Sequence, residues 1–229
     1  MIKVVAVLLA GGSGSRMGGE LPKQFLKVKG RTILEWSIEA FSRHARVDEL
    51  CIVSRADYVE DVKKIVTEGH YDKVRHVLPG GRERYDSSLA AIKAYSNDED
   101  EVRLLLHDAV RPLVSERIIT DCIEALERYE AVDVAIPTTD TIIQVDEEGV
   151  ICQTPARQTL RNVQTPQGFH LPTIQKAYEI ALKDPAFQTT DDCGVVFRYL
   201  PEVPIKVVEG ETTNIKITYP QDLLLMENK

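Results

Sequence analysis

Cysteine is scarce in this chain, and its few cysteines lie far apart. The 229 residues include 4 cysteines, and no two are spaced as the C-x-x-C pattern of a metal or redox motif requires. Sparse, scattered cysteines are typical of proteins in a reducing compartment, so we expect a cytoplasmic protein. Long apolar runs are lacking too, since none approaches the roughly 18 residues that would span a bilayer. The apolar run 4–10 follows a single lysine and has only the minimum length of a signal-peptide core, so no signal peptide is expected.

Positive charge is also in deficit. The chain has 28 Lys and Arg against 36 Asp and Glu, which gives a net charge of −8. A chain this acidic is a poor candidate for general binding to nucleic acid or to a membrane surface, and we expect neither partner. A local cluster of basic residues can still bind a small phosphorylated substrate, so the net charge does not exclude one.

The pattern along the chain predicts an α/β fold. The run 4–9 is apolar at every position and rich in β-branched residues, as expected of a central parallel strand that is covered on both faces. Short strands are predicted also at 50–54, 74–78, 102–106 and 205–208. Helices are predicted at 33–41, 59–66, 87–95, 116–129 (capped by Ser115), 171–182, near 191–199 and from 220. This alternation indicates a doubly wound, mostly parallel, Rossmann-like sheet. No repeat or linker divides the chain, so we expect one domain over 1–229.

A β-hairpin interrupts this alternation. Residues 141–145 and 150–152 are β-rich and flank the polar turn 146–149. A hairpin inserted late in an α/β domain often projects from the body, and we expect an arm at about 138–160. An isolated two-stranded hairpin is only marginally stable, so its apolar surface should pack on something. A second copy of the chain is the simplest partner, because two-fold dimers are the commonest oligomers.

The strongest local signal is the segment LAGGSGSRMG at 9–18, which directly follows the first strand. Its glycines allow the backbone to approach a ligand, and successive N–H groups can bind phosphate oxygens. Arg16 and the nearby Lys23 supply positive charge for the same anion. The spacing fits neither the G-x-G-x-x-G nor the Walker pattern, which disfavours a dinucleotide site or a P-loop. The alternative is a plain glycine turn after a strand.

Two more segments with polar residues follow predicted strands. PGGRERYDSS at 79–88 opens a helix, and Asp86 or Ser87 could simply cap that helix. In HDAVRP at 107–112, Asp108 is a suitable ligand for Mg²⁺ held with substrate phosphates, or else a helix cap. His107 could act as a base, although a hydrogen-bonded structural histidine is the more common case. Because the carboxyl ends of parallel strands share one edge of the sheet, we expect the three segments to converge on one site.

Together these motifs resemble the sugar-nucleotidyltransferase superfamily and, more narrowly, the 2-C-methyl-D-erythritol 4-phosphate cytidylyltransferases. The resemblance covers nearly the whole chain. It includes the glycine-rich loop with the following PKQF at 22–25, the segments at 80–87 and 107–112, and the motifs at 140–141, 157, 164–167, 190–192 and 214–218. It implies transfer of a cytidylyl group from CTP to a polyol phosphate, with release of pyrophosphate and with Mg²⁺ as cofactor.

The resemblance also implies roles for individual residues. Arg16 and Lys23 match stabilisers of the charge that develops on the CTP phosphates, and Asp108 matches the aspartate linked to Mg²⁺. Arg157 and Lys216 match residues that position the attacking phosphate, and Arg157 would serve the site of a neighbouring subunit. Positions that contact CTP are matched by Ala10, Gly11, Gly12, Gly81, Ser87, Asp108 and Ala109, and positions near the polyol phosphate by Arg111, Thr141 and Thr190.

Two alternatives remain open at this point. Ribitol-5-phosphate cytidylyltransferases share nearly all these motifs, including Pro-x-Arg at 155–157. A catalytically silent nucleotide-binding module is the alternative of another class. Such a module would be expected to have lost Arg16, Lys23 or Asp108, and all three are present.

Overall fold

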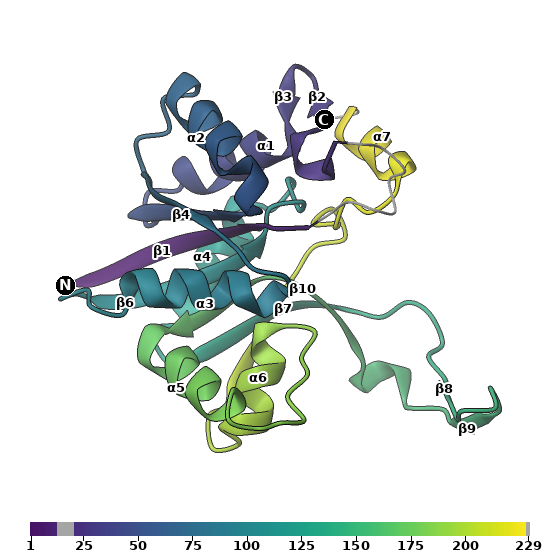
Figure 1. Cartoon of the computed structure of the whole chain (residues 1–229). Helices are drawn as coiled ribbons and strands as arrows, with labels where there is room; N and C mark the ends of the chain where they lie inside the picture. Colours follow the sequence, from purple (N-terminus) through teal and green to yellow (C-terminus); the bar gives the residue numbers. More distant parts are fainter. Residues whose placement is uncertain (13–20, 228–229) are drawn as a thin grey trace.

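The computed structural model describes residues 1–12 and 21–227. A seven-stranded sheet with the order β11-β7-β10-β6-β1-β4-β5 runs through its centre (Figure 1). The strands are β1 (Ile2–Ala10), β4 (Glu49–Ser54), β5 (Val74–Pro79), β6 (Glu101–Asp108), β7 (Ala131–Pro137), β10 (Arg161–His170) and β11 (Ile205–Glu209). Strand β10 runs antiparallel to both of its neighbours, and the other neighbouring pairs are parallel. The predicted mostly parallel sheet is confirmed.

Helices cover both faces of this sheet. Alternate residues of β1 point to opposite sides, so Ala6 and Leu8 belong to one apolar core, and Val5 and Val7 belong to the other. The first core is closed by α1 (Ile33–Ser42), α2 (Val59–Glu68) and α4 (Glu116–Ala125). The second is closed by α3 (Arg84–Tyr95), α5 (Leu171–Ala181) and α6 (Asp192–Tyr199). Because both faces are buried, central strands such as β1 are apolar without alternation, and the doubly wound arrangement is confirmed.

Several elements differ from the sequence-based prediction. Strands β7 and β10 were not predicted, nor was the short hairpin of β2 (Lys27–Val28) and β3 (Arg31–Thr32). Helix α3 begins earlier than expected. Its N-cap is Glu83, so the prediction of Asp86 or Ser87 as the N-cap is wrong, and Asp86 instead closes the capping box from the third helical position. Ser115 caps α4 as predicted, accepting a hydrogen bond from the amide of Ile118. The C-terminal helix begins as the 3₁₀ turn η5 (Pro220–Leu223), followed by α7 (Leu224–Glu227).

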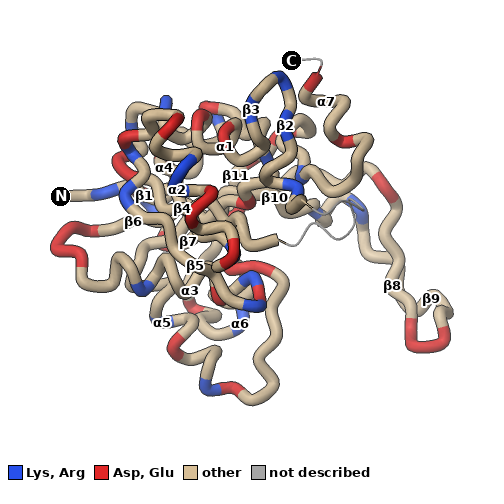
Figure 2. The backbone as a smooth tube through the Cα atoms, turned by 45° about the horizontal axis from the view of Figure 1, so that its top comes forward, with Lys and Arg blue, Asp and Glu red and all other residues tan. Residues whose placement is uncertain are grey.

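The chain between β7 and β10 leaves the body of the molecule as the predicted arm (Figure 1). Its hairpin consists of β8 (Gln144–Val145) and β9 (Ile151–Gln153), which pair antiparallel. Strand β8 is shorter than the predicted 141–145, and β9 is shifted by one residue from the predicted 150–152. Acidic residues occupy the turn between them (Figure 2). Apolar side chains of the arm are 42–58% exposed, and they are Ile142, Ile143, Val145, Val150 and Ile151. Among the described residues, no helix combines the length and the apolar character needed to cross a membrane.

Candidate active site

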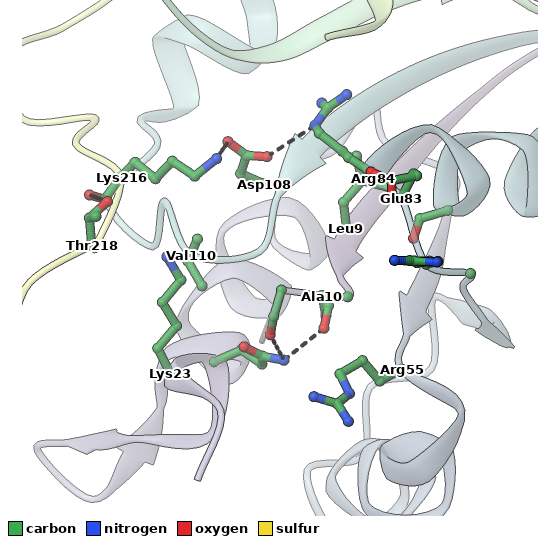
Figure 3. Close-up of a pocket in the computed structure, with 16 residues that line it drawn as sticks. Leu9, Ala10, Lys23, Arg55, Glu83, Arg84, Asp108, Val110, Lys216 and Thr218 are labelled. Carbon is green, nitrogen blue, oxygen red and sulfur yellow. Dashed lines mark hydrogen bonds and ion pairs between the residues drawn. The ribbon is translucent and has the colours of Figure 1, made fainter. Parts of the chain in front are cut away.

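The three predicted strand-end segments meet at a pocket of about 480 Å³. Leu9–Gly12 enter from the end of β1, Gly81–Arg84 from the loop after β5, and Asp108 from the end of β6. Three further segments complete the walls, one with Lys23, one with Arg55 after β4, and one with Lys216. The full lining is Leu9, Ala10, Gly11, Gly12, Lys23, Gln24, Arg55, Gly81, Arg82, Glu83, Arg84, Ser87, Asp108, Val110, Lys216 and Thr218 (Figure 3). Convergence at the carboxyl edge of the sheet is therefore confirmed.

Two glycines allow the walls to approach each other closely. A Cβ atom added to Gly80 would lie 2.5 Å from the hydroxyl of Ser87, which is closer than real Cβ contacts allow. At Gly11 the same hydroxyl would lie 3.2 Å away. The loop after β1 and the start of α3 therefore meet at Ser87, which is buried. Arg16 lies outside the described residues, so its role stays a prediction.

Gln24 connects the loop after β1 to the short helix η2 (Lys23–Phe25). Its side-chain amide donates to the carbonyl of Ala10 at 2.7 Å and to that of Gly12 at 3.3 Å. The neighbouring Lys23 is only 7% exposed, and its Nζ donates to the carbonyl of Ile217 at 2.8 Å. This bond joins η2 to the segment that carries Lys216, so the two walls bearing the predicted lysines are in direct contact.

Asp108 lies among three cationic side chains. Its Oδ2 is 3.0 Å from Lys216 Nζ and 3.4 Å from Arg111 Nε, and its Oδ1 is 3.7 Å from Arg84 Nε. Figure 3 shows the carboxylate between Lys216 and Arg84. The residue is 6% exposed, and burial alone would raise its pKa. Attraction to Lys216, Arg84 and Arg111 outweighs burial and lowers the pKa below the usual 3.8, so Asp108 is ionised at neutral pH.

Arg84 is a site residue that the sequence analysis did not single out. Besides Asp108 it contacts Asp192 at the start of α6, with 2.5 Å between Nη1 and Oδ2. Asp192 is fully buried and also accepts a hydrogen bond from the hydroxyl of Tyr178 at 2.6 Å. Burial opposes the positive charge of Arg84, but the two carboxylates raise its pKa above the usual value. Arg84 therefore links the pocket to α5 and α6.

His107 is a structural residue. It has no exposed surface, its Nδ1 lies 3.0 Å from Thr165 Oγ1, and its Nε2 lies 3.1 Å from the carbonyl of Arg111. A carbonyl can only accept, so Nε2 carries the proton and Nδ1 accepts from the threonine hydroxyl. Burial lowers the pKa of His107 to about 4, which keeps the ring neutral at pH 7. The ring does not line the pocket, so a general-base role finds no support.

The structure separates the remaining predicted residues into two groups. Ala109 and Arg111 lie beside the pocket without lining it: Ala109 is fully buried, and Arg111 reaches Asp108. Thr141 and Arg157 are exposed on the arm, and Thr190 is exposed just before α6. These three do not line the pocket of their own chain.

Sequence reasoning also missed several residues that line the pocket or brace it. Arg82, Glu83 and Arg84 were within a segment already singled out, so their place after a strand was an available signal. Arg55 follows β4 in the same way. Gln24, Thr218 and the bracing Asp192 do not directly follow a predicted strand, although they lie within the motifs 22–25, 214–218 and 190–192 that carry the family resemblance.

Comparisons with known proteins agree with the geometry. A family model described as 2-C-methyl-D-erythritol 4-phosphate cytidylyltransferase matches residues 4–228. An enzyme of that name from Thermobifida fusca (strain YX) is 51% identical over 229 residues, covering 98% of this chain and 92% of that one. A bifunctional ribulose 5-phosphate reductase/CDP-ribitol pyrophosphorylase from Haemophilus influenzae is 42% identical over 226 residues, covering 98% of this chain but 48% of that one.

Solved structures show the same similarity. The 4-diphosphocytidyl-2C-methyl-D-erythritol synthase of Anaerococcus prevotii has a TM-score of 0.86 at 33% identity, with 99% of this chain and 95% of that chain covered. The 2-C-methyl-D-erythritol 4-phosphate cytidylyltransferase of Thermus thermophilus has a TM-score of 0.74 at 30% identity, with 100% of this chain and 98% of that chain covered.

Proposed function

Because the chain belongs to the 2-C-methyl-D-erythritol 4-phosphate cytidylyltransferase family, we propose that its pocket joins CTP to 2-C-methyl-D-erythritol 4-phosphate. The chain is a cytidylyltransferase, and its products are 4-diphosphocytidyl-2-C-methyl-D-erythritol and pyrophosphate. A phosphate oxygen of the acceptor forms a bond to the α-phosphorus of CTP. The bond from that phosphorus to the oxygen bridging to the β-phosphorus breaks, and pyrophosphate leaves with the electron pair.

The observation that carries this proposal is the charge arrangement around Asp108. Lys216 Nζ lies 3.0 Å from Asp108 Oδ2 in the pocket lining, and Lys23 lines the same pocket beside the loop after β1. Phosphoryl and nucleotidyl transfer depend mainly on positioning and on stabilisation of charge, so such cations contribute more than a general base does. We assign Lys23, with Arg16, to the phosphates of CTP, and Lys216 to the attacking phosphate.

Mg²⁺ fits this pocket as an ion that is shared with the substrate. The described residues include no group of three or more His, Cys, Asp or Glu that could hold a metal alone. Asp108 does present a carboxylate to the pocket, and its Oδ1 is 3.7 Å from Arg84 Nε. Mg²⁺ is commonly bound by one or two carboxylates together with substrate phosphates. We therefore propose that Asp108 holds Mg²⁺ with the triphosphate, whose charge the ion would neutralise.

We further propose that two chains associate through their arms. Support comes from the exposed apolar side chains of the hairpin, which a partner arm would cover. Arg157 is exposed on the same arm and donates to the carbonyl of Thr139 at 3.2 Å. It does not line the pocket of its own chain, which favours a role in the partner's site.

The four unpaired cysteines support the cytoplasm as the compartment.

The acceptor is tested by measuring pyrophosphate release from CTP with each of two polyol phosphates. We expect turnover with 2-C-methyl-D-erythritol 4-phosphate to exceed turnover with ribitol 5-phosphate at least tenfold at equal concentration. The relative from H. influenzae makes the second acceptor worth testing. A clear preference for ribitol 5-phosphate would overturn the proposed identity of the acceptor. No pyrophosphate release with either acceptor would overturn the proposed function.

A further inference from the structure

Lys216 reaches Asp108 from a segment without regular secondary structure. Residues 214–218 lie between β11 and η5 and belong to neither a helix nor a strand. The side chain of Lys216 is 39% exposed, so its own packing restrains it only in part. Its Nζ nevertheless lies 3.0 Å from Asp108 Oδ2. Contacts elsewhere in the segment must therefore fix the backbone from which Lys216 extends.

After Lys216, the amide of Ile217 donates to the carbonyl of Val110 at 2.8 Å, and before it Asn214 makes several contacts. Its side-chain Nδ2 donates to the carbonyl of Thr165 at 2.8 Å and to Oε1 of Gln164 at 3.2 Å. Its own carbonyl accepts from Nη1 of Arg111 at 2.8 Å. Both Asn214 and Gln164 are buried, so water does not compete for these bonds. One residue thus ties the segment to β10 and to the arginine that contacts Asp108.

The orientation of the Asn214 amide follows from its partners. Gln164 uses its Nε2 to donate to the carbonyl of Glu211, so its Oε1 is left as an acceptor. The carbonyl of Thr165 is also an acceptor, and a flipped Asn214 would set its oxygen against both. In the observed orientation, Oδ1 is buried and has no hydrogen-bond partner among the residues that the structure describes.

The unpaired Oδ1 lowers stability, whereas the two hydrogen bonds that the amide donates raise it. A buried apolar side chain of similar size would avoid that loss but could not donate to the two acceptors. The feature that only the amide provides is its pair of donors, and these donors fix the segment two residues before Lys216.

We propose that Asn214 is a positioning residue for the cytidylyl transfer and acts through Lys216. It holds the segment so that the ammonium group of Lys216 stays beside Asp108 and meets the attacking phosphate at one place. This inference rests on the proposed function, because the phosphate that Lys216 would meet is the acceptor's. A displacement of a reacting group by about 1 Å can lower the rate on the order of 10²-fold.

The test is a double-mutant cycle between Asn214 and Lys216. Asn214→Ala and the nearly isosteric Asn214→Asp are made in the wild-type chain and in the Lys216→Met chain. In the wild-type chain we expect kcat/KM for the acceptor to fall roughly 10- to 100-fold, with KM for CTP changed less than about twofold. In the Lys216→Met chain the same Asn214 changes should lower kcat/KM for the acceptor less than about threefold, because the ammonium group that Asn214 positions is already absent. Asn97→Ala, at an exposed asparagine outside the pocket, is the matched control and should behave as the wild type.

Equal losses of kcat/KM for the acceptor in the wild-type and Lys216→Met chains would overturn the proposal, since Asn214 would then act independently of Lys216. A parallel loss of CTP affinity would also overturn it. If neither Asn214→Ala nor Asn214→Asp folds, as judged by circular dichroism and thermal melting, the residue is structural and the proposal is wrong. Absence of transfer by the wild-type chain is a separate result, and it would count against the proposed function instead.

Discussion

Asp108→Asn removes one negative charge from the centre of the pocket and keeps the size of the side chain. In the wild type this charge faces Lys216 at 3.0 Å, Arg111 at 3.4 Å and Arg84 at 3.7 Å. The variant leaves three cations close together without the carboxylate that they share. We therefore expect both the stability of the fold and the rate of transfer to fall.

The magnitude follows from what each cation can do without Asp108. Breaking a buried ion pair by removing one partner typically costs about 3–5 kcal/mol. Here Arg84 keeps Asp192 as a partner at 2.5 Å, and Lys216 is 39% exposed and can turn toward water. We therefore expect a loss at or just below the lower limit of that range, about 2–3 kcal/mol. For a chain of this length, such a loss lowers the melting temperature by roughly 5–10 °C.

The stabilisation that the charge of Asp108 provides should depend on pH. The pKa of Asp108 is lower in the folded chain than the usual 3.8, so the folded state favours the ionised carboxylate. The stabilisation is therefore fully present well above pH 3.8 and is lost as the pH falls below that value toward the folded pKa. The difference in stability between wild type and Asp108→Asn should be constant from about pH 6 to 8 and should narrow in acid.

Urea unfolding at a series of pH values measures this difference. Asp72→Asn, at an exposed aspartate, is the control and should change the free energy of unfolding by no more than about 0.5 kcal/mol. A stability of Asp108→Asn equal to the wild type at pH 7 would refute the reasoning. The reasoning would also be refuted if the loss of unfolding free energy in the Asp108→Asn/Lys216→Met double variant equalled the sum of the two single losses. Residues in contact should instead give a non-additive loss.

Three further predictions concern catalysis and assembly. Lys23→Ala and Arg16→Ala should each lower turnover about 10²–10³-fold while weakening CTP binding much less, because their charges act mainly on the transition state; turnover within a few-fold of wild type would contradict these roles. Excess chelator should abolish activity and Mg²⁺ should restore it, because Asp108 is itself an anion and the ion would neutralise both its charge and that of the triphosphate; full activity in chelator would contradict the proposal that Asp108 and the triphosphate share Mg²⁺. Mixing inactive Arg157→Ala chains with inactive Lys23→Ala chains should restore roughly a quarter of wild-type activity, since half of the dimers are mixed and each has one complete site; no recovery after verified subunit exchange would exclude Arg157 from the partner's site.

The parts of the fold that sequence predicts well are those with a simple burial pattern. Strand β1 is apolar at every central position because helices cover both of its faces, and the run 4–9 was recognised for that reason. Strand β10 carries Gln164, Thr165 and Gln167 in buried positions, which no apolar pattern reveals. Their burial is possible because distant groups bond to them, such as Asp133 to Gln167 at 3.0 Å. Strand β7 does have a short apolar run, interrupted by Asp133, and this signal was overlooked.

The site residues also divide into those that the sequence pattern reveals and those that it does not. Gly81 and Asp108 could be found because each follows a predicted strand, and the ends of parallel strands share one edge of the sheet. The contact between Arg84 and Asp192 joins residues 108 positions apart, so only the folded chain reveals it. Thr141 and Arg157 were inferred from the family resemblance alone, and one chain does not bring them to the pocket.

The central claim is that this pocket transfers the cytidylyl group of CTP to 2-C-methyl-D-erythritol 4-phosphate. Phosphorus NMR of the reaction mixture tests it most directly, because it follows the acceptor phosphate, CTP, pyrophosphate and the diphosphate product together. With the wild type we expect the acceptor signal to be replaced by the two coupled signals of a diphosphate diester, with one equivalent of pyrophosphate. With Lys216→Met the same signals should appear far more slowly although CTP still binds. Release of phosphate or pyrophosphate without the diester, or an unchanged rate in the variant, would contradict the account.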